Sequence, residues 1–137
     1  MITALRILFL VILASMIGVT TWAGMQCPLF AVPRPVATHP WFIATMFDAY
    51  WGFITFFVWV CFRQTTWTAR LAWFVAILAL GNIAMSSYCL AALSQAPKDG
   101  KLSDVLVARK AGPGWLGIAL AAAGVAVTVA AAFDTHR

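Results

Sequence analysis

Four long apolar stretches follow one another along the chain, separated by short polar segments. They run over residues 5–23, 41–62, 71–93 and 115–133. A helix of about 20 apolar residues is long enough to cross the roughly 30 Å hydrocarbon core of a membrane. The pattern therefore predicts an all-α integral membrane protein, in which residues 1–137 form a single transmembrane domain, a bundle of four transmembrane helices.

The connecting segments predict how these spans are joined. Residues 25–40 contain four prolines, which disfavour regular helix and favour an extended loop. The short segment "RQTTWTAR" (63–70) predicts that the second and third helices form a tight antiparallel hairpin. The basic loop over 95–113 contains "LSDVLVARK", an amphipathic stretch suited to a membrane surface.

Composition places the chain in lipid. With 64% apolar and 9% charged residues and no glutamate, it could not cover a water-facing surface. The net charge of +5 is scattered over the loops and forms no basic stripe, which argues against nucleic acid as a partner. We expect membrane lipids and other membrane-protein subunits as partners, in a bacterial inner membrane, either cytoplasmic or intracytoplasmic.

The basic residues do not decide the orientation of four spans. Those on one side would be Arg6, Arg63, Arg70 and Arg137, and those on the other Arg34, Lys98, Lys101, Arg109 and Lys110. The rule that positive loops stay inside cannot separate two sets of nearly equal size. The tight turn between Arg63 and Arg70 favours placing both termini in the cytoplasm.

One carboxylate, Asp48, lies inside the second span, roughly 10 Å from its start. Ionised at that depth it costs on the order of 3 kcal/mol, so it should face protein, pair with a donor or be protonated. Thr45 shares its helix face, and an antiparallel third helix would bring Ser86 to the same depth and Asn82 about one turn deeper. We therefore expect an intramembrane polar cluster, either structural or used for proton transfer or ion binding.

The last span has a different character. Its small residues recur at intervals that let another helix approach closely. They are Gly117, Ala121, Gly124 and Thr128. This predicts a helix-packing face, directed at its own bundle or at a neighbouring subunit.

Catalytic and metal-binding patterns are absent from the sequence. Cys27, Cys61 and Cys89 show no CxxC or Cys/His spacing, so neither a disulfide framework nor a metal site is indicated. We expect no catalytic residue, no metal and no cofactor, and leave open only a bound lipid or pigment. Trp51 and Trp59, deep in the second span, are explained better by packing or lipid contact than by a pigment.

A longer pattern covers the second and third spans. It includes "HPWFIATMFDAYWGFITFFVWVCFR" and "LGNIAMSSYCL". The matching residues are Pro40, Trp41, Phe42, Ala44, Thr45, Asp48, Tyr50, Gly52, Phe53, Phe56, Trp59, Val60, Trp73, Gly81, Asn82 and Tyr88. From about His39 to Leu93 the chain resembles a family of small uncharacterised integral membrane proteins of bacteria, with plant relatives, described only as a domain of unknown function. The resemblance implies a membrane fold and no known activity.

Small size, absent catalytic machinery and a close-packing last helix favour a non-catalytic protein. We expect an accessory, structural or assembly subunit of a larger membrane complex, such as a respiratory or photosynthetic one. The alternative is a small oligomeric transporter, channel or proton-coupled carrier in which Asp48 is the titrating group.

Overall fold

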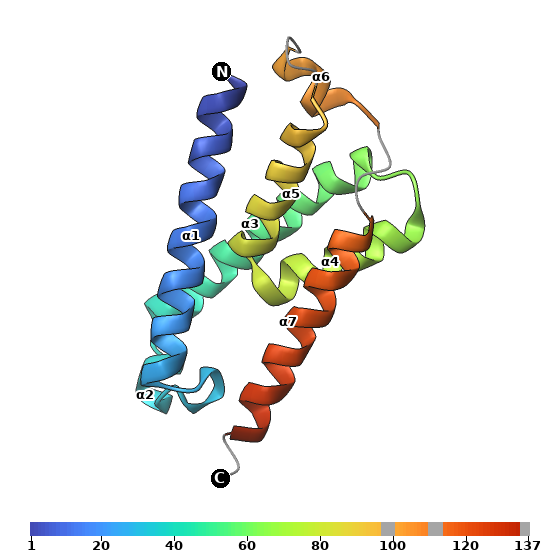
Figure 1. The fold of residues 1–137 in the computed structure, drawn as a ribbon. Coiled ribbons are helices and arrows are strands. Elements are labelled where there is room, and N and C mark those ends of the chain that lie inside the picture. The colour runs from blue at the N-terminus through green and yellow to red at the C-terminus, as the bar shows by residue number, and fades with distance from the viewer. Residues whose placement is uncertain (97–100, 110–113, 135–137) are drawn as a thin grey trace.

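The computed structural model describes residues 1–96, 101–109 and 114–134, and all regular structure in these segments is helical, which confirms the all-α class. Lys98, Lys110 and Arg137 lie outside the described residues. The elements in chain order are α1 (Ile2–Gln26), the 3-10 turn η1 (Leu29–Ala31), α2 (Arg34–Ala37), α3 (Pro40–Arg63), α4 (Trp67–Leu80), α5 (Asn82–Ser94), α6 (Leu102–Val107) and α7 (Gly114–Asp134) (Figure 1).

Three of the described helices, rather than four, are long and apolar enough to span a membrane: α1, α3 and α7. The predicted span 71–93 is broken at Gly81 into α4 and α5, of 14 and 13 residues. Each is about 20 Å long, too short for a 30 Å hydrocarbon core. The prediction of a fourth continuous span is therefore wrong, because the apolar pattern continues past residue 81 while the helix does not.

The break at Gly81 has a local and a tertiary cause. Gly81 has φ +51°, a conformation that is easy for glycine and strained for residues with a side chain. A Cβ at this position would lie 2.7 Å from Cζ of Phe53 in α3. The ring of Phe53 therefore occupies the space that any larger residue would need at the bend.

α4 runs alongside the first half of α7 in the same direction. A Cβ on Gly114, where α7 begins, would lie 3.6 Å from Ala69 Cβ, and a Cβ on Gly124 would lie 2.6 Å from Ala79 Cβ. Small residues at these positions let the two backbones approach closely. Because residue 124 is the middle of α7, α4 ends half-way along that helix.

α5 returns along the first half of α1 in the opposite direction. Arg6 Nη2, near the start of α1, donates a hydrogen bond of 2.7 Å to the carbonyl of Leu93, near the end of α5. At the other end of α5, Gly81 meets Phe53, close to the middle of α3. The α4–α5 hairpin therefore enters the bundle to about its middle and leaves at the end where it entered (Figure 1).

The packed core lies on this hairpin. Its buried residues are Val60, Trp73, Ala76, Ile77, Ala84 and Tyr88. Of these only Val60 comes from another helix, α3, and α1 buries no residue at all. The long helices α1, α3 and α7 therefore surround the hairpin and expose most of their surface.

The connections differ in detail from those predicted. The segment 25–40 contains the turns η1 and α2 instead of extended chain alone, because Pro35 lies in the first turn of α2, where a missing N–H is tolerated. Residues 64–66 join α3 to α4 in a short turn. The rings of Phe57 in α3 and Phe74 in α4 lie 4.9 Å apart, so the two helices pack against each other next to this turn. The amphipathic stretch of the basic loop forms α6.

Candidate functional site

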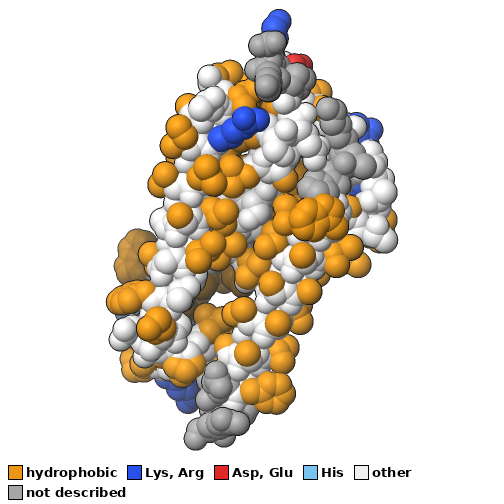
Figure 2. Space-filling model, viewed as in Figure 1, with side chains coloured by type: hydrophobic (Ala, Val, Ile, Leu, Met, Phe, Trp, Pro, Cys, Tyr) orange, Lys and Arg blue, Asp and Glu red, His pale blue; other side chains and the backbone are white. Residues whose placement is uncertain are grey.

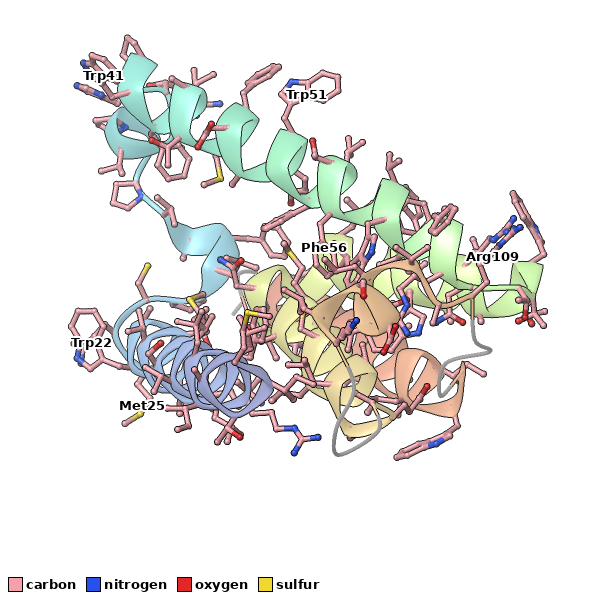
Figure 3. All side chains as sticks on the ribbon, turned by 90° about the horizontal axis from the view of Figure 1, so that it is seen from above. Trp22, Met25, Trp41, Trp51, Phe56 and Arg109 are labelled. Atoms are coloured by element: carbon pink, nitrogen blue, oxygen red, sulfur yellow. The ribbon has the colours of Figure 1, made fainter. Side chains whose placement is uncertain are left out.

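The first half of α3 faces away from the other helices. Only 6% of its most apolar 18-residue window is buried, and Trp41, Phe47 and Trp51 are largely exposed. In Figure 3 the side chains of Trp41 and Trp51 point outward, whereas Phe56, further along the helix, points toward α5. This half of α3 therefore presents a largely exposed aromatic surface, and α2 is a short helix that contacts α3.

Asp48 lies on this outward face and is exposed. No other described residue forms a hydrogen bond with its carboxylate. Thr45 Oγ1 donates a 2.7 Å hydrogen bond to the carbonyl of Trp41 in its own helix, Asn82 is exposed at the start of α5, and Ser86 is buried. The structure does not bring the four residues of the expected polar cluster together.

The direction of α5 explains this arrangement. The expected cluster required a helix antiparallel to α3, but the bend at Gly81 makes α5 run parallel to α3. The ring of Tyr88 lies 5.9 Å from that of Phe56 and 5.4 Å from that of Trp59. These positions are more than two helical turns beyond Asp48, so the residues of α5 lie beside the second half of α3.

The small residues of α7 lie against α4. A Cβ on Gly117 would lie 2.9 Å from Trp73 Nε1, and a Cβ on Gly124 would lie 2.6 Å from Ala79 Cβ, both in α4. Ala121 packs against the core cluster, and Thr128 Oγ1 donates a 2.8 Å hydrogen bond to the carbonyl of Gly124. Gly117, Ala121 and Gly124 therefore pack on the chain's own bundle, whereas Thr128 lies beyond the end of α4 and its hydrogen bond stays within α7.

A second notable site is the buried Arg63 at the end of α3, whose side chain is only 3% exposed. Its Nε donates a 3.2 Å hydrogen bond to the carbonyl of Ala108, while Nη1 is buried without an acceptor. The ring centroids of Trp59 and Tyr88 lie 5.4 and 5.9 Å from the guanidinium carbon. No carboxylate of the described residues pairs with this guanidinium. Because arginine stays charged and a buried unpaired charge is costly, an anionic partner here would stabilise the site.

Gln64 extends this cluster and is 1% exposed. Its Nε2 donates a 3.3 Å hydrogen bond to the Tyr88 hydroxyl, its Oε1 has no donor, and its backbone carbonyl accepts from Arg70 Nε at 3.0 Å. From the sequence, Arg63 and Arg70 are predicted only to bound a tight hairpin turn and to favour an orientation. The signal that this interpretation missed is that "RQTTWTAR" follows an apolar span with two arginines and a glutamine but no carboxylate.

Most of the described basic residues share one end of the bundle, which we call the arginine-rich end. They are Arg6, Arg63, Arg70, Lys101 and Arg109. Side-chain hydrogen bonds join Arg6 to the end of α5, Arg63 to the residue after α6, and Arg109 Nε to the carbonyl of Phe62 in the last turn of α3 at 3.3 Å. Arg34, in α2, lies at the opposite end, and Figure 2 shows apolar side chains covering the middle of the visible face.

A model of a protein family described as a protein of unknown function (DUF1475) matches residues 1–111. The chain belongs to this family. The DUF1475 match runs from α1 to α6, and α7 lies outside the matched residues. It therefore includes both the outward face of α3 and the arginine-rich end, but its description assigns no activity to either. No curated protein and no solved structure matches the chain.

Proposed function

We propose that the protein is a non-catalytic accessory or assembly subunit of a larger membrane complex, which it joins through the outward face of α3. The observation that carries this proposal is Asp48, exposed on a helix long and apolar enough to span a membrane. An ionised carboxylate against lipid costs on the order of 3 kcal/mol. Since no described side chain satisfies it, a basic, amide or hydroxyl group of a neighbouring subunit supplies its partner.

The surroundings of Asp48 support close contact with another helix. Gly52 lies one turn further along the same face, and a Cβ there would meet nothing within 4 Å, which leaves room for a second backbone. Phe47 and Trp51 flank this strip with large exposed side chains, and aromatic anchors beside a small-residue contact are typical of protein interfaces.

The three spanning helices and the basic residues also support an orientation. The α4–α5 hairpin enters and leaves on one side, so the chain crosses the membrane three times. The N-terminal end of α1 and the C-terminal end of α7 then lie on opposite sides, which differs from the expectation that both termini are cytoplasmic. The arginine-rich end then faces the cytoplasm of a bacterial inner membrane, because basic residues are retained inside. Of the described lysines and arginines, only Arg34 lies at the other end.

The orientation is tested by cysteine labelling in intact cells. In a C61A/C89A background, an impermeant maleimide should label Cys27, which follows α1 at the end opposite the arginine-rich one. In a C27A/C61A/C89A chain carrying Ser103→Cys on α6, labelling should appear only after permeabilisation. Labelling of Ser103→Cys in intact cells would reverse the orientation.

The subunit proposal is tested by gentle detergent extraction and native mass spectrometry. The wild-type chain should appear in one larger species of fixed stoichiometry with different subunits. Asp48→Ala should release the chain, whereas Asp104→Ala, which removes an exposed carboxylate outside the spans, should not. A wild-type chain found alone, or an Asp48→Ala chain retained in the complex, contradicts the proposal.

One observation favours the alternative of a small oligomeric transporter or channel. Backbone that turns back at membrane depth is tolerated where it is buried in protein or lines a water-filled cavity, and the α4–α5 hairpin turns back at Gly81 in this way. A species that contains only copies of this chain, with pH-dependent flux in vesicles that is lost in Asp48→Asn, would establish this function instead.

A further inference from the structure

Two cavities adjoin at the arginine-rich end. The first, of about 490 Å³, is lined by Arg63, by the polar residues Gln95, Ser103 and Asp104, and by five small or apolar residues. The second, of about 340 Å³, is lined by residues of α1, α3, α5 and α6. Ala92 and Val105 line both cavities. A single elongated molecule could therefore occupy the two together.

The first cavity has the chemistry of an anion site. Arg63 lines it, is only 3% exposed, and has a buried Nη1 without an acceptor. A phosphate or carboxylate offers the charge-assisted hydrogen bonds that such a guanidinium lacks. Asp104 also lines the cavity, but it is exposed and its Oδ2 accepts a 3.0 Å hydrogen bond from the backbone N–H of Lys101. The arginine-rich end carries five basic residues and this single cavity-lining carboxylate, so the net charge around the cavity is positive.

The second cavity has the chemistry of an acyl-chain site. Its lining is apolar or aromatic and includes Leu5 and Phe9 of α1, Phe56 and Trp59 of α3, and Leu102 of α6. Phe56 and Trp59 lie about two turns and one turn before Arg63 on α3, so this cavity extends from the arginine toward the middle of the bundle. A molecule that fills both cavities would place its charged group at the end of the bundle and its apolar tail toward the middle. A lipid in a bilayer leaflet has this orientation.

We propose that the arginine-rich end binds one anionic amphiphile, with its phosphate or carboxylate on Arg63 and its acyl chain in the adjoining apolar cavity. This site is on a different part of the molecule from Asp48 and does not depend on the subunit proposal. It would hold an anionic membrane lipid, or a fatty acid, as an integral part of the fold at the membrane surface.

The test uses the full-length protein, delipidated in detergent and titrated with dioleoylphosphatidylglycerol. Native mass spectrometry should show one tightly bound lipid per chain, with an affinity at least about tenfold higher than for dioleoylglycerol, which has the same acyl chains but no phosphate, since hydrogen bonds to a charged group contribute more than neutral ones. Arg63→Gln should abolish that preference. Arg34→Gln, which removes an exposed arginine at the opposite end of the bundle, should leave it intact.

Further measurements separate the two halves of the site. Ala92→Leu fills the junction of the cavities and should weaken lipid binding, whereas Ala91→Leu, at a neighbouring position that lines neither cavity, should not. If Arg63→Gln does not fold, Arg63→Lys keeps the charge and should retain part of the preference for phosphatidylglycerol. Equal binding of the two lipids, or full competition by inorganic phosphate at equal concentration, would overturn the proposal.

Discussion

The α4–α5 hairpin and the first half of α3 are both strongly apolar, yet they occupy opposite environments. The hairpin contributes most of the buried core, including Trp73 and Tyr88. The first half of α3 exposes its large side chains, among them Trp51, which is 60% exposed. Apolar character therefore identifies residues that avoid water, but it does not say whether they meet protein or lipid.

Small residues mark the places where helices of this chain approach one another closely. In a membrane, helices gain little from leaving lipid for protein, so close approach of backbones decides which surfaces associate. Gly117 and Gly124 of α7 provide that approach against α4. In α3, Gly52 provides the same opportunity but meets nothing within 4 Å, which agrees with a surface kept for another chain.

The largest contrast is expected between two tryptophans. Trp73 is 0% exposed, and Trp73→Ala should lower the free energy of unfolding by about 3–5 kcal/mol, because it leaves a cavity in the core. Trp51→Ala should change it by about 0.5 kcal/mol or less. Unfolding in mixed micelles with increasing SDS, followed by circular dichroism, measures both. Similar losses would mean that the outward face of α3 is packed within the chain.

Gly81→Ala should have the next largest effect. The positive φ and the overlap with the Phe53 ring together should cost about 3 kcal/mol. Gly52→Ala is the matched control, because its Cβ has open space and alanine favours helix by about 1 kcal/mol over glycine. The same unfolding measurement applies, and equal stability of Gly81→Ala and wild type would show that the bend does not require glycine.

Gly124→Ala should separate α7 from α4. Its Cβ would lie 2.6 Å from that of Ala79, so we expect a loss of about 2 kcal/mol from overpacking. Gly18→Ala in α1, where a Cβ meets nothing within 4 Å, should show no loss. Limited proteolysis of the detergent-solubilised chain would detect the released helix, and an unchanged cleavage pattern would contradict the close contact.

The smallest effect is expected for a single hydroxyl. Tyr88→Phe removes the partner of the buried Gln64 amide and should cost about 1–2 kcal/mol. Tyr50→Phe, on the exposed face of α3, should be neutral. Equal unfolding free energies of Tyr88→Phe and the wild type would show that the amide finds another partner.

How far the site could be predicted depends on the range of the interactions involved. The packing face of α7 follows from local spacing, and Gly117 and Gly124 do lie against another helix. The pairing of Asp48 with Ser86 depended on the direction of a distant helix, which a local pattern does not contain. Arg63 shows why burial is hard to foresee, since its neighbours Tyr88 and Ala108 come from segments far along the chain.

The apolar pattern alone predicts an all-α chain and the positions of its three helices long and apolar enough to span a membrane, α1, α3 and α7, because helix length and hydropathy are local properties. Only the tertiary structure decides that the remaining apolar stretch bends at Gly81, that α5 lies parallel to α3, and that the basic residues gather at one end. The physical reason is that the bend combines a glycine conformation with the Phe53 ring of another helix. Such a contact exists only once the chain is folded.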